Sequence, residues 1–329
     1  MIAIHHERLN DNIDSFKDEI DLHIEQVRSS LYKQIKSGKL CIKNVQKPLT
    51  ETQKFYLRYL RSKLEKIVFA DPEQLDGYLK IFDKIIPLNI RRNKSVFTPF
   101  KNELIKMMGY ETLRSDDKKA LYPKFFNKLG INTCVYCNSQ LTIAVEYADN
   151  SLVARFQVDH FVDKANYPCF SISFFNLYPV CASCNNKKGN KTIGFKLYSD
   201  NTLKIKKSDY QFVLDQESLV KFRLSKEEQL LEIQFDDNGH GLNEHLAVNG
   251  IYQTQKDLAA EIIVKSEIYN DSYKRSLKSS FKKLYGKNGI ANIDFSRFIV
   301  GNYCDPIEIH KRPMAKFTHD IARQLGLIP

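Results

Sequence analysis

The sequence predicts an α+β protein, in which a small core of strands and helix lies between a helical N-terminal region and a mixed C-terminal region. Three observations predict this class. Apolar residues recur at helical spacing in the first 125 residues, short alternating segments dominate between Cys134 and Lys191, and both patterns occur after residue 200. We therefore expect three regions: a helical region at 1–125, a compact core at 126–200 and an α+β region at 201–329.

The N-terminal region is predicted to contain three helices. The first has apolar residues every three or four positions, which form one face, and Gly38 is expected to end it. These residues are Ile13, Phe16, Ile20, Ile24, Val27, Leu31 and Ile35. A second helix is predicted to begin at the capping box Thr50 to Gln53 and to stop at Asp71-Pro72, and a third covers residues 75–86.

Basic residues such as Arg58, Arg61 and Arg91 accompany these helices. They are compatible with an arm that docks a partner or grips nucleic acid. They are equally compatible with a helical scaffold that has a solvated basic face.

The C-terminal region mixes the two patterns. Alternating or continuous apolar runs predict strands at 203–205, 219–224 and 231–235, and Asp236 to Gly239 reads as a turn. Helical spacing returns from about residue 255 and is expected to end at Gly286. Its basic residues either follow phosphates or form a charged solvent face. They are Lys274, Arg275, Lys278, Lys282 and Lys283.

Composition narrows the class of partner. The chain has 43% apolar residues, a formal charge of +11 and a pI of about 9.1, which suit a polyanion but also a merely soluble basic protein. No apolar run approaches the ~20 residues that span a bilayer, and the first residues do not form an export signal. We therefore expect a cytoplasmic protein without a membrane partner.

Four of the seven cysteines form two Cys-x-x-Cys pairs, Cys134 with Cys137 and Cys181 with Cys184. Each pair can form a turn that directs two sulfurs at one ion, and four thiolates complete the tetrahedral shell of a structural zinc. A closed shell leaves no position for water or substrate, so this zinc would stabilise the fold and would not catalyse. The alternative is that the four thiols are buried by coincidence.

The interval between the two pairs carries the candidate chemistry. Residues 155–161 alternate like a strand and deliver Asp159 and His160 at its end, and Asn185 directly follows the second pair. Adjacent strand residues point to opposite sides, so we expect the strand to break here and let both side chains reach one site. Individually, a histidine after a strand is more often structural than catalytic.

The spacing of these residues resembles that of the HNH, or ββα-metal, endonucleases. Their motif has a strand ending in Asp-His, a central Asn-Leu before the second Cys-x-x-Cys, and a His or Asn nine residues after the central Asn. Asp159-His160, Asn176-Leu177 and Asn185 match it in order and spacing. The family usually has His in the last place, and the Asn here favours Mg²⁺ or Mn²⁺ as the bound ion.

The resemblance implies a role for each residue in hydrolysing a phosphodiester. His160 would accept a proton from the attacking water, and Asp159 and Asn185 would hold one divalent ion that neutralises developing charge. Asn176 would brace the loop that carries His160. The nearby lysines can contact phosphates. These are Lys187, Lys188 and Lys191.

The stretches 159–168, 301–303 and 311–320 further resemble a bacterial HNH subgroup. Related subgroups act as effector nucleases in anti-phage systems, often beside an ATPase subunit, as in Septu-like and retron-linked modules. The resemblance thus implies a DNA endonuclease, with RNA less favoured, and an ATPase partner. The competing hypothesis is a zinc-stabilised nucleic-acid-binding module or scaffold subunit that does not cleave.

Overall fold

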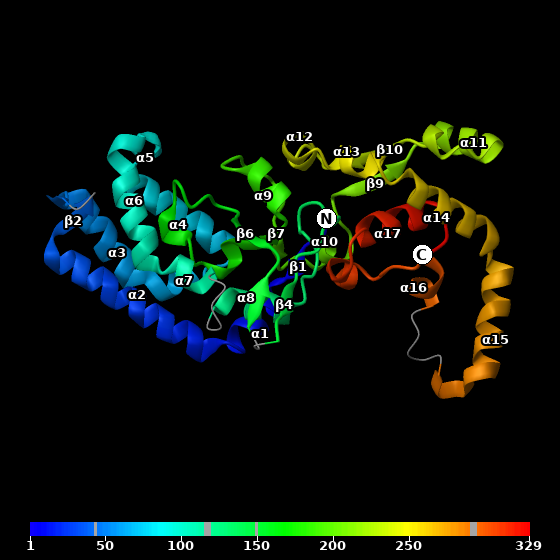
Figure 1. Ribbon diagram of the computed structural model, residues 1–329, viewed down its shortest axis with the longest axis horizontal. Helices are drawn as coiled ribbons and strands as arrows, with labels where there is room; N and C mark the ends of the chain where they lie inside the picture. Colours follow the sequence, from blue (N-terminus) through cyan, green and yellow to red (C-terminus); the bar gives the residue numbers. More distant parts are fainter. Residues whose placement is uncertain (43–44, 115–119, 149–150, 290–294) are drawn as a thin grey trace.

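The chain is elongated, with helices at one end, a small strand-and-helix unit near the middle and further helices at the other end (Figure 1). A computed structural model describes residues 1–42, 45–114, 120–148, 151–289 and 295–329. Its described part contains five separate two-stranded sheets among many helices. The predicted α+β class is therefore correct.

The N-terminal end consists mainly of helices. They are α1 (His6–Asp14), α2 (Lys17–Ser37), α3 (Glu51–Val68), α4 (Pro72–Ile85), α5 (Leu88–Arg92), α6 (Lys94–Met108), α7 (Tyr110–Arg114) and α8 (Leu121–Leu129). The hairpin of β2 (Lys39–Ile42) and β3 (Val45–Pro48) joins α2 to α3.

Local signals set the ends of these helices as predicted. Gly38 ends α2 with a φ of 62°, a left-handed conformation that glycine adopts without strain. Thr50 and Gln53 form the expected capping box of α3. Asp71 also forms a capping box, and Pro72 begins α4. The predicted first helix differs in one respect, because a break at Ser15 and Phe16 separates α1 from α2.

The middle of the chain contains the hairpin β4 (Ala144–Glu146) with β5 (Leu152–Ala154), followed by β6 (Gln157–His160). Two short 3-10 helices, η1 (Pro168–Phe170) and η2 (Phe174–Asn176), lead to β7 (Leu177–Val180) and then to α9 (Ala182–Lys188). Strands β6 and β7 pair in antiparallel register, with His160 opposite Leu177. The order strand, strand, helix is therefore present across the predicted core.

The C-terminal end again mixes helices with short strands. Its first elements are β8 (Tyr198–Ser199), α10 (Thr202–Lys206), β9 (Gln211–Leu214), α11 (Gln216–Ser225), η3 (Glu228–Leu230) and β10 (Ile233–Asp236). They are followed by α12 (Leu242–Leu246), α13 (Val248–Gln253), α14 (Lys256–Ile268), α15 (Asp271–Gly289), α16 (Phe295–Val300), η4 (Pro306–Lys311) and α17 (Ala315–Gln324).

Two of the strands predicted in this region are helices. Residues 203–205 belong to α10 and residues 219–224 belong to α11, whereas the predicted third strand is β10. The cause is local capping that the apolar pattern did not reveal. The Asn201 side chain accepts the Leu203 N–H at 2.9 Å, and the Asp215 side chain accepts the Ser218 N–H at 2.8 Å.

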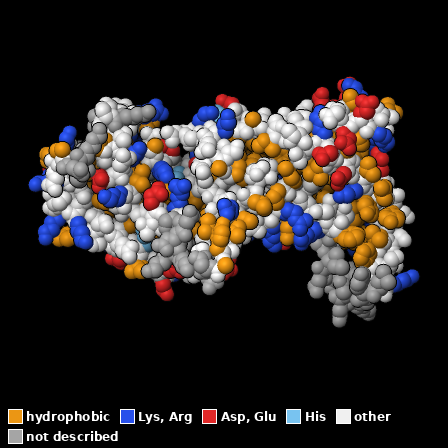
Figure 2. All heavy atoms as spheres, in the orientation of Figure 1, with side chains coloured by type: hydrophobic (Ala, Val, Ile, Leu, Met, Phe, Trp, Pro, Cys, Tyr) orange, Lys and Arg blue, Asp and Glu red, His pale blue; other side chains and the backbone are white. Residues whose placement is uncertain are grey.

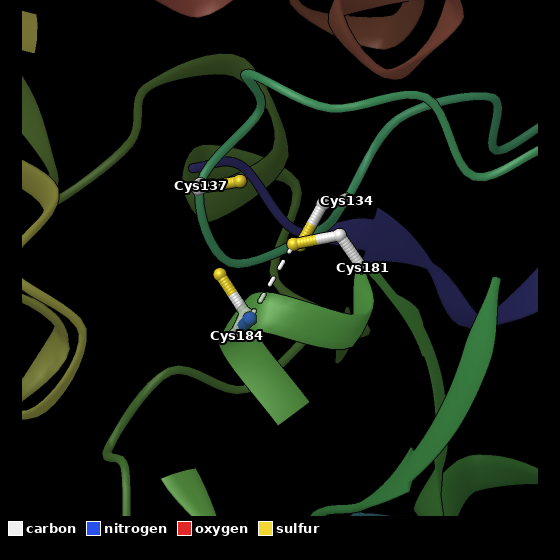
Figure 3. Close-up of side chains that lie close together, drawn as sticks. All are labelled: Cys134, Cys137, Cys181 and Cys184. Carbon is white, nitrogen blue, oxygen red and sulfur yellow. Dashed lines mark hydrogen bonds between the residues drawn. The ribbon is translucent and has the colours of Figure 1, made fainter. Parts of the chain in front are cut away.

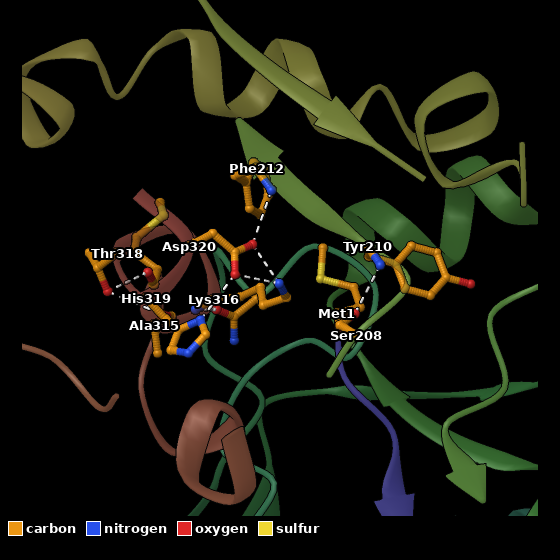
Figure 4. A network of polar contacts seen from close by, with 11 residues as sticks. Met1, Ser208, Tyr210, Phe212, Ala315, Lys316, Thr318, His319 and Asp320 are labelled. Atoms are coloured by element: carbon orange, nitrogen blue, oxygen red, sulfur yellow. Dashed lines mark hydrogen bonds and ion pairs between the residues drawn. The ribbon is translucent and has the colours of Figure 1, made fainter. Parts of the chain in front are cut away.

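Contacts between distant segments join the regions into one body. Strand β1 (Ile4–His5) pairs in parallel with β8, and one hydrophobic cluster includes residues from all three predicted regions. Helix α17 is tied to β9 through Asp320, which accepts the Phe212 N–H at 3.0 Å and a bond from Lys316 Nζ at 2.6 Å (Figure 4). The three predicted regions share one hydrophobic core, and the boundaries between them stay a prediction.

The surface carries both charges and apolar side chains. Lys and Arg side chains gather over α9 and over the junction of α7 with β6 (Figure 2). Within the part of the chain that the structure describes, no helix combines the length and the apolar character that crossing a bilayer requires.

Candidate active site and zinc centre

The four paired cysteines converge on one point in the middle of the chain (Figure 3). Their Sγ atoms all lie within 4.8 Å of one another, all four residues are buried, and none forms a disulfide. Tetrahedral zinc with Zn–S bonds of about 2.3 Å needs sulfurs roughly 3.8 Å apart. The donor type, the number of donors and their proximity therefore fit a structural zinc, and this cluster could hold one zinc ion.

The electrostatics of the cluster also favour a cation. Burial raises the pKa of the Cys134 thiol well above its ordinary value, while the hydrogen bond with Cys134 lowers the pKa of Cys137. One thiolate is thus favoured, but four buried thiolates would repel one another. A bound divalent ion is what allows all four to ionise together.

Neighbouring groups hold the first cysteine pair in place. Ser139 Oγ donates to Cys137 Sγ at 3.1 Å, and Tyr252 Oη donates to the Cys137 carbonyl at 2.7 Å. Asn138 has a φ of 52°, and its side-chain amide donates to Thr133 Oγ1 at 2.8 Å. The main-chain carbonyl of Asn138 accepts the Met314 N–H at 2.7 Å. The cluster is therefore anchored to the C-terminal region as well as to the core.

The second cysteine pair also determines where α9 begins. Cys181 is the N-cap of this helix, and its Sγ accepts the Cys184 N–H at 3.4 Å. Because the sulfur that caps the helix belongs to the cluster, the cluster sets the start of α9. It thereby sets the positions of Asn185 and Lys188 along that helix.

One face of β6 is covered by α9. Alternate strand residues share a face, so Gln157 and Asp159 point the same way. Asn185 Nδ2 donates to Gln157 Oε1 at 2.7 Å, and Lys188 Nζ lies 2.9 Å from Asp159 Oδ2. Tyr136 Oη also donates to Asp159 Oδ2, at 2.6 Å. The structure thus brings Asp159 and Asn185 to the same side of the strand.

His160 points to the other face of β6. Its Nε2 lies 3.0 Å from the Ser171 carbonyl oxygen, and its ring centroid lies 5.0 Å from that of Tyr110. A carbonyl oxygen only accepts, so Nε2 carries the proton and Nδ1 carries the lone pair. Burial, together with the nearby charge of Lys164, lowers the pKa of His160 to about 3. The ring is therefore neutral near pH 7.

Both residues lie within paired strand, so the expected break between them is absent. Asp159 is opposite Tyr178 in the register and His160 is opposite Leu177. What joins the two is Lys188, whose Nζ contacts the Asp159 carboxylate and also donates to the His160 carbonyl at 3.1 Å. The pair is linked through a lysine and not through a shared loop.

Asn176 is fully buried and holds the segment that follows His160. Its Oδ1 accepts the Val162 N–H at 2.7 Å. Its Nδ2 donates to the carbonyls of Val162 and Phe170, both at 3.1 Å. These three bonds close the loop between β6 and β7.

The basic residues named from sequence occupy different environments. Lys187 and Lys191 are exposed, whereas Lys188 is buried against Asp159. Arg91 is also buried, where it pairs with Asp83 and lies 4.2 Å from the centroid of the Tyr167 ring. Arg91 therefore stabilises the fold at this position and does not extend from the surface.

Two residues near the site, Tyr136 and Tyr110, were not predicted from sequence. Tyr136 lies inside the first cysteine pair, so its proximity to the site could have been inferred from that pair. Tyr110 and Lys164 meet only in the folded chain, where Lys164 Nζ lies 4.0 Å from the centroid of the Tyr110 ring. No local pattern connects residues so far apart in sequence.

Comparison with known proteins gives a similarity over a short stretch of the chain. No family model matches the chain, and no solved structure matches it. The chain is 38% identical over 58 residues to the Septu protein PtuB of Bacillus thuringiensis. The match covers 18% of this chain and 20% of that protein, so the similarity extends over about a fifth of each.

Proposed function

We propose that this protein is a metal-dependent endonuclease of the HNH type that hydrolyses phosphodiester bonds, with DNA as the favoured substrate. One observation carries the proposal. The hairpin β6–β7 and helix α9 place Asp159, His160, Asn176 and Asn185 along or beside the short strand β6, with Asp159 and Asn185 on one face and His160 on the other, next to a cluster of four cysteines. These are the residues, in the order along the chain, that the HNH resemblance implies.

The tautomer of His160 is the one that a general base at this position would need. The ring is neutral, its Nε2–H is engaged by Ser171, and Nδ1 retains a lone pair that can accept a proton from water. The Ser171 carbonyl also keeps the ring from rotating. We propose that Nδ1 is the atom that takes the proton.

The oxygen donors of Asp159 and Asn185 suit Mg²⁺ or Mn²⁺. Such an ion, when bound, would neutralise charge that develops on the phosphate and on the leaving oxygen. Asp159 is held in place by Tyr136, and Asn185 by Gln157. Because Lys188 already contacts Asp159, an ion would have to share this carboxylate with the ammonium or displace it.

Nucleic acid would approach along a basic surface. Lys187 and Lys191 are exposed at the end of α9, where their charges are available to phosphates. We also propose that the protein is an effector of anti-phage defence and acts beside a second, ATPase subunit. The similarity to a Septu protein supports the defence role and the expectation of a partner.

The proposal is tested by comparing wild type with His160→Ala in Mg²⁺ and in Mn²⁺. Wild type is expected to nick or linearise plasmid and to leave 5′ phosphates. His160→Ala is expected to cleave about 10²- to 10⁴-fold more slowly and to bind DNA with unchanged affinity. Lack of cleavage by wild type across both ions, DNA and RNA, with and without candidate partners, would exclude the nuclease.

A second candidate is a zinc-stabilised nucleic-acid-binding module or scaffold subunit that does not cleave. One observation favours it: Lys188 pairs with Asp159, so the charged member of the two proposed ion ligands already has a partner. Such a module would bind nucleic acid in a salt-dependent way and would stay inactive with every ion. The His160→Ala comparison therefore separates the two candidates.

A further inference from the structure

Lys164 is a partly buried cation four residues after His160. Its ammonium lies over the Tyr110 ring, 4.0 Å from the ring centroid. Within the described residues, no carboxylate oxygen lies within ion-pair distance of this ammonium. Burial lowers the pKa of Lys164, which indicates that its charge is partly desolvated. A partly desolvated charge without a neighbouring carboxylate gains more electrostatic stabilisation from a bound anion than a charge that is already paired.

Tyr110 connects this cation to His160. The ring centroid of Tyr110 lies 5.0 Å from that of His160, and Tyr110 Oη donates to the Val158 carbonyl of β6 at 3.4 Å. One fully buried aromatic ring from α7 therefore contacts both the candidate base and the lysine. The N-terminal helical region thus contributes directly to the environment of His160.

Other cations near His160 are already paired. The charges of Lys164, Lys188 and Arg114 all act on His160. Lys188 pairs with Asp159 at 2.9 Å, and Arg114 lies 3.8 Å from Glu111. Lys164 also interacts electrostatically with Asp159 and Glu111, but at longer range. Of these three cations, Lys164 is the one whose charge no described carboxylate neutralises at short range.

We propose that Lys164 contacts the phosphate of the bound nucleic acid next to His160, and that Tyr110 is the positioning residue that holds its ammonium there. This inference rests on the proposed function, because it assigns the anion to the substrate of that site. Phosphate oxygens are the anions that a phosphodiester brings to such a cation. The contact would neutralise charge on the reacting phosphate and would strengthen as that charge grows.

The test compares Lys164→Met, which keeps most of the aliphatic stem, with Lys164→Arg, which keeps the charge. Lys17→Met is the matched control. Lys17 is also half-buried over an aromatic ring, 4.4 Å from the centroid of Phe69, but Asp21 pairs with it at 3.0 Å. For each variant, binding to a short DNA duplex is measured against salt concentration without added Mg²⁺ or Mn²⁺. Single-turnover cleavage is then measured with the ion.

Loss of one phosphate contact is expected to reduce the slope of log K against log salt by about 0.9 in Lys164→Met. Cleavage should slow by about 10²-fold. Lys164→Arg should keep the salt slope of wild type. Lys17→Met should change neither the salt slope nor the cleavage rate. A merely structural role for Lys164 would leave the salt slope unchanged.

The outcomes distinguish this inference from the proposed function. If wild type cleaves and Lys164→Met matches it in slope and rate, the inference is wrong and the nuclease stands. If wild type binds but never cleaves, the nuclease is excluded, and the salt slope alone decides whether Lys164 contacts phosphate. Absence of any binding by wild type to duplex or single-stranded DNA or RNA would overturn both.

Discussion

The ammonium of Lys188 lies 2.9 Å from Oδ2 of Asp159, and the two side chains are only 1% and 7% exposed. The same ammonium donates to the His160 carbonyl, so it joins α9 to the end of β6. A buried ion pair contributes little net stability when compared with an apolar pair, but losing one partner leaves a charge without compensation. Asp159 therefore depends on Lys188 in the absence of another cation.

We expect Lys188→Met to lower the free energy of unfolding by about 3–5 kcal/mol, because it leaves the Asp159 carboxylate buried and unpaired. Urea unfolding with zinc present measures this change. Lys187→Met, at the exposed neighbouring position, is the control and should stay within about 0.5 kcal/mol of wild type. Equal stabilities of the two variants would contradict a buried ion pair at Asp159.

The cysteine cluster predicts about one zinc per chain by elemental analysis. Ser139→Ala is expected to weaken zinc binding about 10- to 100-fold, because it removes the hydroxyl that donates to Cys137 Sγ at 3.1 Å. Competition with a metal chelator measures this affinity. Cys169→Ala changes a buried cysteine outside the cluster and should leave the zinc content and affinity unchanged. Zinc loss in that control would refute the assignment of the four ligands.

Alanine variants of Asn176 and Asn185 test two different roles and can be compared directly. Asn176→Ala would leave the Val162 N–H and two carbonyls without their partner, so we expect a loss of more than about 3 kcal/mol. Asn185→Ala removes one bond at a half-buried position, and about 1 kcal/mol or less is expected. Thermal or urea unfolding distinguishes them. If the proposed function holds, Asn185→Ala should lose cleavage while it stays folded.

His310 predicts a pH dependence of stability. Burial, together with the charges of the N-terminus and Arg8, lowers its pKa to about 4, from about 6.5 in an unfolded chain. Between these values the unfolded chain binds the extra proton. The effect of His310 on stability is therefore absent above about pH 6.5, and it lowers the free energy of unfolding by about 1.4 kcal/mol per pH unit as the pH falls from there toward about 4.

His310→Gln is the variant that checks this dependence. Glutamine cannot titrate, and its amide can still donate to the Ile2 carbonyl, which His310 Nε2 contacts at 2.9 Å. Unfolding is measured by urea between about pH 7 and pH 5. The variant should lack the part of the slope that His310 contributes, and identical slopes would show that this histidine does not titrate on unfolding.

Several local features could be predicted from sequence because they depend on short-range interactions. The capping box of Thr50, the glycine that ends α2 and the strand that carries Asp159 and His160 are all present. The apolar pattern failed at residues 203–205 and 219–224, where helix caps at Asn201 and Asp215 outweigh it. A short apolar run is ambiguous between strand and helix, and capping decides which one forms.

The sequence by itself determined which four cysteines form the candidate zinc cluster and the order of Asp159, His160, Asn176 and Asn185, because their spacing along the chain is part of the motif. Only the tertiary structure decided that Lys188 is buried against Asp159 and that the Tyr110 ring contacts both His160 and Lys164. The physical reason is the distance along the chain over which each kind of interaction acts. Spacing and capping act over a few residues, whereas the burial of a charge depends on which faces of distant elements meet.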